Sequence, residues 1–295
     1  MSMISCKRIL ALAACLMCLA GTALAVDPLP IDFSPGPVPD ASRFTEDSYE
    51  DESISVHMER IWVDECQFHV AHVTIADASQ LRTALAAPFG KNKTNRVSTI
   101  ARDHNAIVAT GGDYYGNEEG GYVVRMGETG RKKPLKSRDM LVIDGNGDFH
   151  ILIHSDSEQL RALVESDIPI VNVFNFGPAL VCGGELQAMP EKYQYNIKGR
   201  EPRCAIGQTG PLSYVMVVAD GRGAGDSKGC SVETLARVMA DLGCLEAYNL
   251  DGGGSALMYF GGENYSTKSF KAERSVSDII YFATAVESPA ESGEE

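Results

Sequence analysis

Basic side chains are scarce in this sequence of 295 residues, which has 26 Lys and Arg against 40 Asp and Glu and a formal net charge of −14. A surface with this balance repels phosphate polymers and anionic lipid headgroups. We therefore expect neither nucleic acid nor an anionic membrane surface to be the main partner. The remaining composition, 44% hydrophobic and 22% charged, fits one large globular domain with a well-filled core.

Long hydrophobic runs are absent beyond the N-terminus. There, Lys7 and Arg8 precede an apolar run over 9–20 and a small-residue site ending at Ala25, the pattern of an export signal cleaved after that residue. Two alternatives stay open, a lipoprotein processing site at Cys15 and an uncleaved membrane anchor. We expect an extracytoplasmic protein, secreted or associated with the cell envelope, with no membrane contact beyond this segment.

The cysteines offer no metal knuckle and no dithiol redox motif, because no two of those beyond residue 25 have the Cys-x-x-Cys spacing. An odd number outside the cytoplasm permits at most two disulfide bonds. Cys230 and Cys244 flank a predicted helix and are the preferred pair, although spacing does not determine the pairing. The cysteines in question are Cys66, Cys182, Cys204, Cys230 and Cys244.

Motifs for metals and nucleotides are also missing. No Lys follows the triple glycine at 252–254, as a Walker phosphate loop requires, and no Gly-x-Ser-x-Gly nucleophile elbow occurs. His150 and His154 lack a third nearby ligand, and Asp144 opens a run better explained as a hairpin turn than as a calcium loop. We expect no metal and no cofactor.

Alternating apolar residues over 54–58 and 68–73 are typical of half-buried strands, and similar runs recur at 106–110, 121–126, 139–143, 149–153, 212–219 and 277–286. Helical patterns are fewer, at 78–87, 94–104, 157–164 and 231–242, the last with Ser231 as cap and Gly243 as stop. These patterns predict an α+β fold with large, mainly antiparallel β-sheets and a few flanking helices. We expect a single domain over 53–287, after a Pro-rich acidic linker at 26–52 and before an acidic tail at 288–295.

The most informative segment reads Asn-Leu-Asp-Gly-Gly-Gly-Ser over 249–255. Successive glycines imply a backbone that turns sharply or approaches another group closely. In one interpretation its N–H groups bind an anionic oxygen, beside the carboxylate of Asp251 and the hydroxyl of Ser255. In the other the segment is a tight turn, in which Asp251 accepts hydrogen bonds from its own loop. Its polar and glycine positions are Asn249, Asp251, Gly252, Gly253, Gly254 and Ser255.

This segment is similar to the signature of the phosphodiester glycosidase family, and four other blocks resemble that family in the same order. They are Thr-Gly-Gly-Asp-Tyr-Tyr at 110–115, Gly-Pro-Ala-Leu-Val at 177–181, Pro-Arg-Cys-Ala-Ile-Gly at 202–207 and Val-Ala-Asp-Gly-Arg at 218–222. The resemblance covers roughly residues 100–286. Thr110 stands where the family has Asn, Asp113 where it has an aromatic residue, and Cys204 where it has a small polar residue.

The resemblance implies a catalytic domain that hydrolyses a sugar-1-phosphodiester on the sugar side, with a carbohydrate or sugar phosphate as substrate and surface polysaccharide as its source. Such a reaction needs carboxylates near the anomeric carbon and positive charge on the phosphate. One alternative is a non-catalytic carbohydrate-binding or exopolysaccharide-assembly protein, suggested by Thr110 and Asp113. Another is a hydrolase that cuts the phosphate side.

Within these blocks, Asp251 and Asp220 are the candidate catalytic carboxylates, since each follows an apolar strand run and precedes glycine. Arg203 and Arg222 are the candidate phosphate ligands, because a guanidinium group matches phosphate oxygens. Simpler interpretations stay open. Asp220 could be a turn residue in its Asp-Gly pair, and each arginine could form a surface or structural salt bridge. The remaining predicted substrate contacts are Gly111, Gly112, Asp113, Tyr114 and Asn175.

Overall fold

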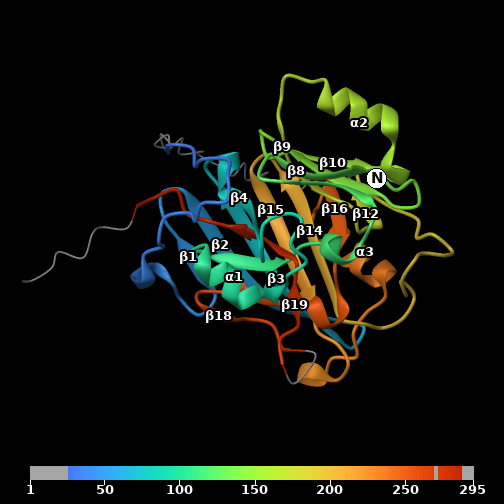
Figure 1. Cartoon of the computed structure of the whole chain (residues 1–295). Coiled ribbons are helices and arrows are strands. Elements are labelled where there is room, and N and C mark those ends of the chain that lie inside the picture. Colours follow the sequence, from blue (N-terminus) through green and yellow to red (C-terminus); the bar gives the residue numbers. More distant parts are fainter. Residues whose placement is uncertain (1–25, 269–271, 288–295) are drawn as a thin grey trace, which may run out of the picture.

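The largest element is an eight-stranded sheet in which every strand is antiparallel to its neighbours. The structure is a computed structural model that describes residues 26–268 and 272–287 (Figure 1). In spatial order the strands are β1 (Ser48–Glu50), β2 (Ile54–Val63), β3 (Cys66–Ile75), β15 (Ser213–Ala219), β14 (Arg203–Gly210), β16 (Glu246–Leu250), β12 (Ala179–Cys182) and β13 (Glu185–Leu186).

Two five-stranded antiparallel sheets and a two-stranded pair complete the described architecture. One sheet has the order β10 (Phe149–Leu152), β9 (Met140–Asp144), β11 (Ile170–Phe174), β7 (Gly121–Arg125) and β8 (Glu128–Lys133). The other has the order β18 (Glu263–Asn264), β17 (Met258–Phe260), β6 (Val108–Gly111), β20 (Asp278–Phe282) and β4 (Leu81–Leu85), and the pair joins β19 (Ser275–Val276) to β5 (Asn95–Arg96). The predicted α+β fold with mainly antiparallel sheets is confirmed.

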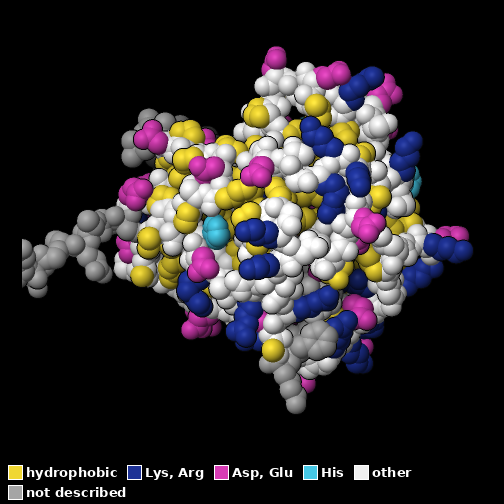
Figure 2. Space-filling view, in the orientation of Figure 1, with side chains coloured by type: hydrophobic (Ala, Val, Ile, Leu, Met, Phe, Trp, Pro, Cys, Tyr) yellow, Lys and Arg dark blue, Asp and Glu magenta, His cyan; other side chains and the backbone are white. Residues whose placement is uncertain are grey.

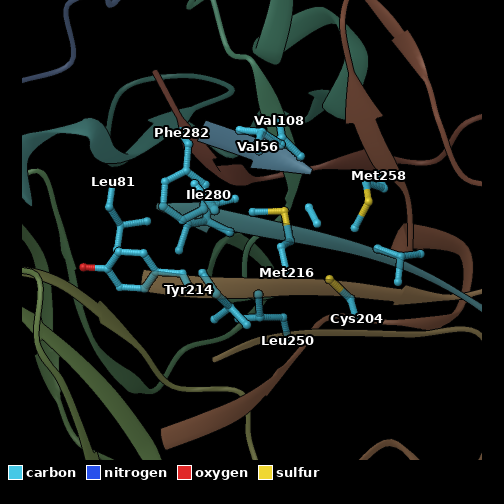
Figure 3. Close-up of a cluster of buried hydrophobic side chains, with 14 of the residues drawn as sticks. Val56, Leu81, Val108, Cys204, Tyr214, Met216, Leu250, Met258, Ile280 and Phe282 are labelled. Atoms are coloured by element: carbon cyan, nitrogen blue, oxygen red, sulfur yellow. The ribbon is translucent and has the colours of Figure 1, made fainter. Parts of the chain in front are cut away.

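Successive side chains along each strand point to opposite faces of the sheet, so one strand contributes to two hydrophobic layers. In β15, Tyr214, Met216 and Val218 face a central core shared with the sheet that contains β20, whereas Val215 and Val217 face the opposite side. Figure 3 shows Tyr214 and Met216 among side chains from several strands of these two sheets. Burying one such apolar side chain contributes roughly 1.5–3 kcal/mol, so this core holds the two sheets together.

Three α-helices cover the outer faces of the sheets in the described part of the chain, and α2 lies at the top of Figure 1. They are α1 (Val97–Asp103), α2 (Ser157–Val164) and α3 (Val232–Asp241). As predicted, Ser231 caps α3 by accepting a hydrogen bond from the Thr234 N–H, and Gly243 follows with a φ of 80°. None of the helices in the described ranges is long and apolar enough to cross a membrane.

The predicted helix at 78–87 is wrong. A 3-10 turn at Ala78–Gln80 leads into β4, which pairs with β20. Leu81 packs into the central core and Ala84 into the cluster beneath α1, so this strand is buried on both faces. The helix-forming composition of the segment is overridden because the strand completes the edge of a buried sheet.

The predicted linker at 26–52 is also wrong, since this segment is packed against the domain. Tyr49 lies in β1 and is only 1% exposed. The fully buried Arg82 donates hydrogen bonds to the carbonyls of Pro30, Asp32 and Ser34 at 2.9, 3.1 and 3.0 Å. These bonds to a charged donor hold the proline-rich chain against the domain. The predicted signal at 1–25 and the acidic tail at 288–295 lie outside the described residues.

The preferred cysteine pairing is wrong as well. Cys230 and Cys244 flank α3, but a Cβ added to Gly207 would lie 2.6 Å from the Cys244 Sγ atom, which places that thiol over β14. Cys230 instead lies beside Cys66, and the interaction of the two thiols lowers the pKa of Cys66 and raises that of Cys230. The intervening helix thus separates the two cysteines that flank it.

We predict that Arg82→Ala lowers the free energy of unfolding by at least about 3 kcal/mol, because it removes charge-assisted hydrogen bonds and leaves carbonyl oxygens without their donor. Chemical denaturation of the purified protein measures this change. Arg161→Ala, at an exposed position of α2, is the matched control and should stay within about 0.5 kcal/mol of the parent. A loss from Arg82→Ala no larger than that of the control would contradict the assigned role.

Candidate active site

The candidate site lies at the edge of the large sheet that is formed by strand ends. There β15 and β16 end, and β14, which lies between them, begins. Arg203, the first residue of β14, pairs with Ala219, the last residue of β15. On the other side of β14, Cys204 pairs with Leu250, the last residue of β16. Asp220 and Asp251 directly follow those strand ends, so both lie beside Arg203 at this edge.

The triple-glycine segment bends tightly at the same edge. A Cβ on Gly252 would lie 2.7 Å from the Pro202 carbonyl oxygen, and Gly253 has a φ of 58°. Both positions therefore require glycine. Gly253 donates its N–H to the Pro202 carbonyl at 2.7 Å, and Gly253–Ser255 form a single 3-10 turn that includes Gly254.

The other glycine block packs against this bend. The Asp251 N–H donates to the Gly112 carbonyl at 3.1 Å, and a Cβ on Gly111 would lie 3.4 Å from the Ser255 carbonyl oxygen. A Cβ on Gly112 would lie 2.6 Å from a carboxylate oxygen of Asp278. Two segments far apart in the sequence therefore meet through their backbones.

A cavity of about 210 Å³ opens at this edge. Asp251 and Glu201 bring carboxylates to its wall, and Arg203 and Arg222 bring guanidinium groups. The aromatic rings of Phe176 and Tyr195, stacked with their centroids 4.4 Å apart, form an apolar part of the wall. The full lining is Phe176, Tyr195, Asn196, Glu201, Arg203, Arg222, Leu250, Asp251, Gly252 and Gly253.

The two arginines are held in different ways. Arg203 is 6% exposed and donates from Nε to the Cys230 carbonyl at 3.1 Å and from Nη2 to two further carbonyls at 2.8 Å. Burial lowers the pKa of this guanidinium. Arg222 donates from Nε to Glu201 Oε2 at 2.7 Å, and a Cβ on Gly253 would lie 3.3 Å from its Nη2 atom. The glycine bend thus leaves room for Arg222 at the cavity.

Asp251 is the carboxylate at the centre of this arrangement. Part of its side chain faces the cavity, while the surrounding protein removes most of its water, and this desolvation raises its pKa to about 6. A hydrogen bond from Ser255 and the charge of Arg274 act in the opposite direction, and Asp113 reinforces the rise. Asp251 therefore changes its charge close to neutral pH, as a general acid or base requires.

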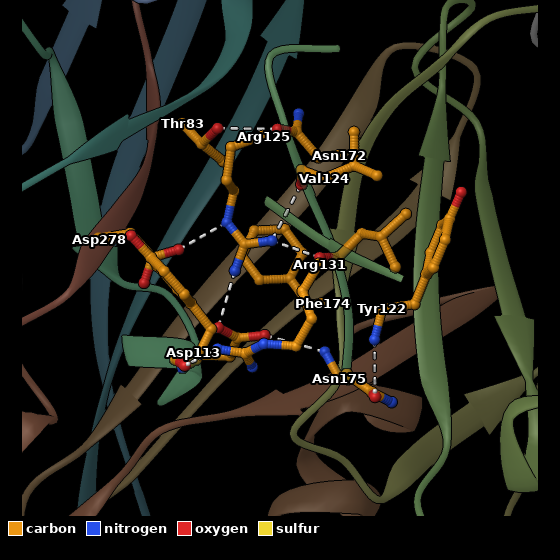
Figure 4. Close-up of polar contacts among 12 residues, drawn as sticks. Thr83, Asp113, Tyr122, Val124, Arg125, Arg131, Asn172, Phe174, Asn175 and Asp278 are labelled. Carbon is orange, nitrogen blue, oxygen red and sulfur yellow. Dashed lines mark hydrogen bonds and ion pairs between the residues drawn. The ribbon is translucent and has the colours of Figure 1, made fainter. Parts of the chain in front are cut away.

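A buried ion cluster lies behind Asp251, and the sequence motifs did not identify it. Arg125 donates from Nε to Asp278 at 2.6 Å and from Nη2 to Asp113 at 2.7 Å, and Figure 4 shows it between these two carboxylates. Burial raises the pKa of Asp278 to about 7 against the effect of Arg125. The available signal was a charged residue at the end of the otherwise apolar strand β7 and another at the start of β20.

Asp220 does not line the cavity. It is 1% exposed, and its Oδ2 atom lies 2.8 Å from His69 Nε2 while Oδ1 accepts the Thr267 N–H at 3.2 Å. These contacts anchor the start of the loop that carries Arg222. A direct catalytic role of Asp220 stays a prediction without a shared cavity to support it.

The remaining predicted contacts lie in buried hydrogen bonds or beside the ion cluster. Asn249 donates to the Gly177 carbonyl at 2.6 Å, and Asn175 donates to the Asp139 carbonyl at 3.1 Å while its N–H bonds Asp113 at 2.9 Å. Tyr114 lies under the guanidinium of Arg274, 5.9 Å from ring centroid to Cζ. Asp113 is therefore a partner of Arg125, and Asn175 helps to hold it.

Charged side chains of both signs are mixed on the surface. On the face shown in Figure 2, Lys and Arg side chains are interspersed with Asp and Glu, although the sequence is acidic overall. Within the described residues, no three His, Cys, Asp or Glu side chains are grouped so that they could hold a metal ion.

The described fold is an antiparallel α+β domain, and Asp251, the glycine bend, Arg203 and Arg222 line one cavity in it. A family model described as phosphodiester glycosidase matches residues 104–283, which is more than half of the chain. The chain belongs to the phosphodiester glycosidase family, a family of hydrolases.

Solved structures share the fold at low sequence identity. The catalytic domain of zebrafish N-acetylglucosamine-1-phosphodiester alpha-N-acetylglucosaminidase, auto-inhibited by its pro-peptide, is 19% identical with a TM-score of 0.63, over 78% of this chain and 83% of that one. A hypothetical protein from Synechocystis is 18% identical with a TM-score of 0.57, over 79% of this chain and 63% of the other.

A curated relative matches part of the sequence. The SPbeta prophage-derived uncharacterized protein YomE of Bacillus subtilis (strain 168) is 31% identical over 121 residues, which is 40% of this chain. The match spans 19% of that protein's own length.

We predict that Arg125→Met lowers the free energy of unfolding by about 4 kcal/mol at neutral pH, because it leaves two buried carboxylates without their cation. Chemical denaturation measures the loss. The loss should shrink in mildly acidic buffer, where Asp278 takes up a proton and no longer needs a partner. Arg237→Met, which breaks an exposed pair with Asp64, is the control and should change stability by under about 1 kcal/mol at both pH values.

We also predict that Asp251→Asn becomes more stabilising as the pH rises. The pKa of Asp251 is about 6 in the folded chain and near its ordinary value of 3.8 when unfolded, so ionisation opposes folding as the pH rises through this range. The gain in unfolding free energy relative to the parent should grow by about 2 kcal/mol between about pH 4.5 and about pH 7.5. Denaturant titrations at both pH values measure this gain. The control is Asp167→Asn at an exposed position, whose unfolding free energy relative to the parent should be the same at both pH values.

Proposed function

We propose that this chain is an exported glycosidase that hydrolyses sugar-1-phosphodiester linkages, of the N-acetylglucosamine-1-phosphodiester kind, in cell-surface or exopolysaccharide material. The observation that carries the proposal is that Asp251, Gly252 and Gly253 line the same cavity as Arg203 and Arg222. Family membership supports the reaction class. The export pattern of residues 1–25 supports the location.

The cavity supplies the charges that this reaction needs. Cleavage of the bond between the anomeric carbon and oxygen develops positive charge on the sugar and negative charge on the departing phosphate monoester. Arg222 and Arg203 stabilise the phosphate oxygens as that charge develops. Phosphate monoesters leave readily, so little protonation of the leaving group is required.

Asp251 then acts on the sugar side. In its ionised form, which prevails above about pH 6, it stabilises the oxocarbenium-like transition state or takes a proton from the attacking water. The stacked rings of Phe176 and Tyr195 offer an apolar surface for one face of the sugar. Arg125, Asp113 and Asp278 lie behind Asp251 and hold its surroundings in place without touching the substrate.

We predict that the full chain releases sugar from an alkyl N-acetylglucosamine-1-phosphodiester, and that Asp251→Asn lowers kcat by at least about 10³-fold while KM changes little. A panel of glycosyl phosphodiesters with chromatographic detection of free sugar measures this. Asp167→Asn, at an exposed acid outside the family blocks and the cavity lining, is the matched control and should keep full activity. Parental activity in Asp251→Asn would refute the role of this carboxylate.

The products distinguish the remaining alternatives. In ¹⁸O-labelled water the label should enter the sugar, because the bond to the anomeric carbon breaks. Label in the phosphate monoester would instead mean cleavage on the phosphate side. Calorimetric binding of a sugar phosphate without any product after long incubation would favour the non-catalytic carbohydrate-binding alternative.

A further inference from the structure

Two cysteines meet under the loop that carries Arg222. Cys66 is the first residue of β3, and Cys230 directly precedes Ser231, the cap of α3. They are free thiols, 0% and 2% exposed, and their interaction lowers the pKa of Cys66 and raises that of Cys230. Cys66 Sγ also lies 3.4 Å from the Asp220 carbonyl oxygen.

Backbone contacts hold the two chain segments together independently of the thiols. Lys228 donates its N–H to the Glu65 carbonyl at 3.0 Å, and Gln67 donates its N–H to the Ser227 hydroxyl at 3.1 Å. Asp220 donates its N–H to the Gln67 carbonyl at 2.9 Å. Hydrogen bonds on both sides of Cys66 therefore fix it against the loop that ends at Cys230.

We propose that Cys66 and Cys230 form a disulfide bond in the exported protein. The proposal rests on the export proposed above, because disulfide bonds persist in oxidising compartments and are rare in the cytosol. The bond would join the start of β3 to the end of the loop that carries Arg222. Gln67, next to Cys66, accepts the Asp220 N–H, and the Cys230 carbonyl accepts from Arg203, so the bond would fix both of these supports.

Formation of the bond requires an oxidant of the disulfide class, either an oxidised dithiol oxidoreductase or glutathione disulfide. One cysteine attacks the oxidant as thiolate and forms a mixed disulfide, and the second displaces the oxidant's remaining thiol. The two cysteines lose two protons and two electrons in total, and the oxidant's disulfide becomes two thiols. Since both cysteines are buried in the folded chain, the exchange takes place while the chain folds.

The positions of the other described cysteines separate them from this pair. Cys204 lies 2.9 Å from the Thr110 hydroxyl, and Cys244 lies over Gly207 of β14. Cys182 ends β12, which β15, β14 and β16 separate from β3 in the large sheet. We therefore expect these three to remain thiols.

Peptide mapping tests the pairing directly. The full chain, isolated from the periplasm of a bacterial host, is alkylated in denaturant, digested and analysed by mass spectrometry. We expect one linked peptide containing Cys66 and Cys230 that separates on reduction, with Cys182, Cys204 and Cys244 alkylated. A bond between Cys230 and Cys244 would overturn the proposal.

A second arm separates this proposal from that of export. The same protein is unfolded with dithiothreitol and refolded in a mixture of reduced and oxidised glutathione. A Cys66–Cys230 bond after refolding would support the pairing independently of export. Recovery of the full chain, expressed with its own residues 1–25, only from the cytoplasm of the host would count against export, and the refolded protein would then decide the pairing. Absence of the bond after refolding would overturn the pairing wherever the protein resides.

The stability of the protein gives an independent measurement. Dithiothreitol should lower the midpoint of thermal unfolding of the oxidised protein by roughly 5–15 °C, because the bond closes a long loop in the unfolded chain. Cys66→Ser and Cys230→Ser should each abolish this response, and Cys182→Ser, at a partly exposed position, should keep it. A parental midpoint that does not respond to reduction would contradict the proposal.

Discussion

The register of β15, β14 and β16 is the constraint on which the candidate site depends. Pairing of Arg203 with Ala219 and of Cys204 with Leu250 brings Arg203 between the two acids that follow the neighbouring strands. This register is enforced by the core, since Cys204 and Ile206 face the central cluster while Ala205 faces α3. A slip by one residue would exchange these faces and move Arg203 away from the cavity.

Burial of charge is the second feature that shapes the site. Asp113 and Asp278 lie on either side of Arg125, which repays part of the cost of removing two carboxylates from water. Asp251 lines the cavity instead, and desolvation raises its pKa to about 6. These neighbouring carboxylates thus lie in different environments. Asp251 lines the cavity, whereas Asp113 and Asp278 form ion pairs inside a buried cluster.

Local signals in the sequence predicted the elements whose cause is local. The ends of α3 follow from the Ser231 cap and the left-handed Gly243, and the glycines at 252 and 253 follow from steric limits on the backbone. The segments at 26–52 and 78–87 were predicted wrongly because distant partners order them. Arg82 holds the first through its carbonyls, and β20 pairs with the second.

The sequence by itself indicated the antiparallel α+β class and the glycine bend beside Asp251, because these depend on alternation, capping and the conformational limits of single residues. The family followed from the resemblance of five sequence blocks in the same order. Only the tertiary structure decided that Asp251 shares a cavity with Arg203 and Arg222, that Asp220 bonds His69 instead, and that Arg125 joins Asp113 to Asp278. The physical reason is strand order. In the large sheet β3 lies beside β15 and β14 beside β16, and pairings between strands so far apart in the chain are selected by packing of the whole core.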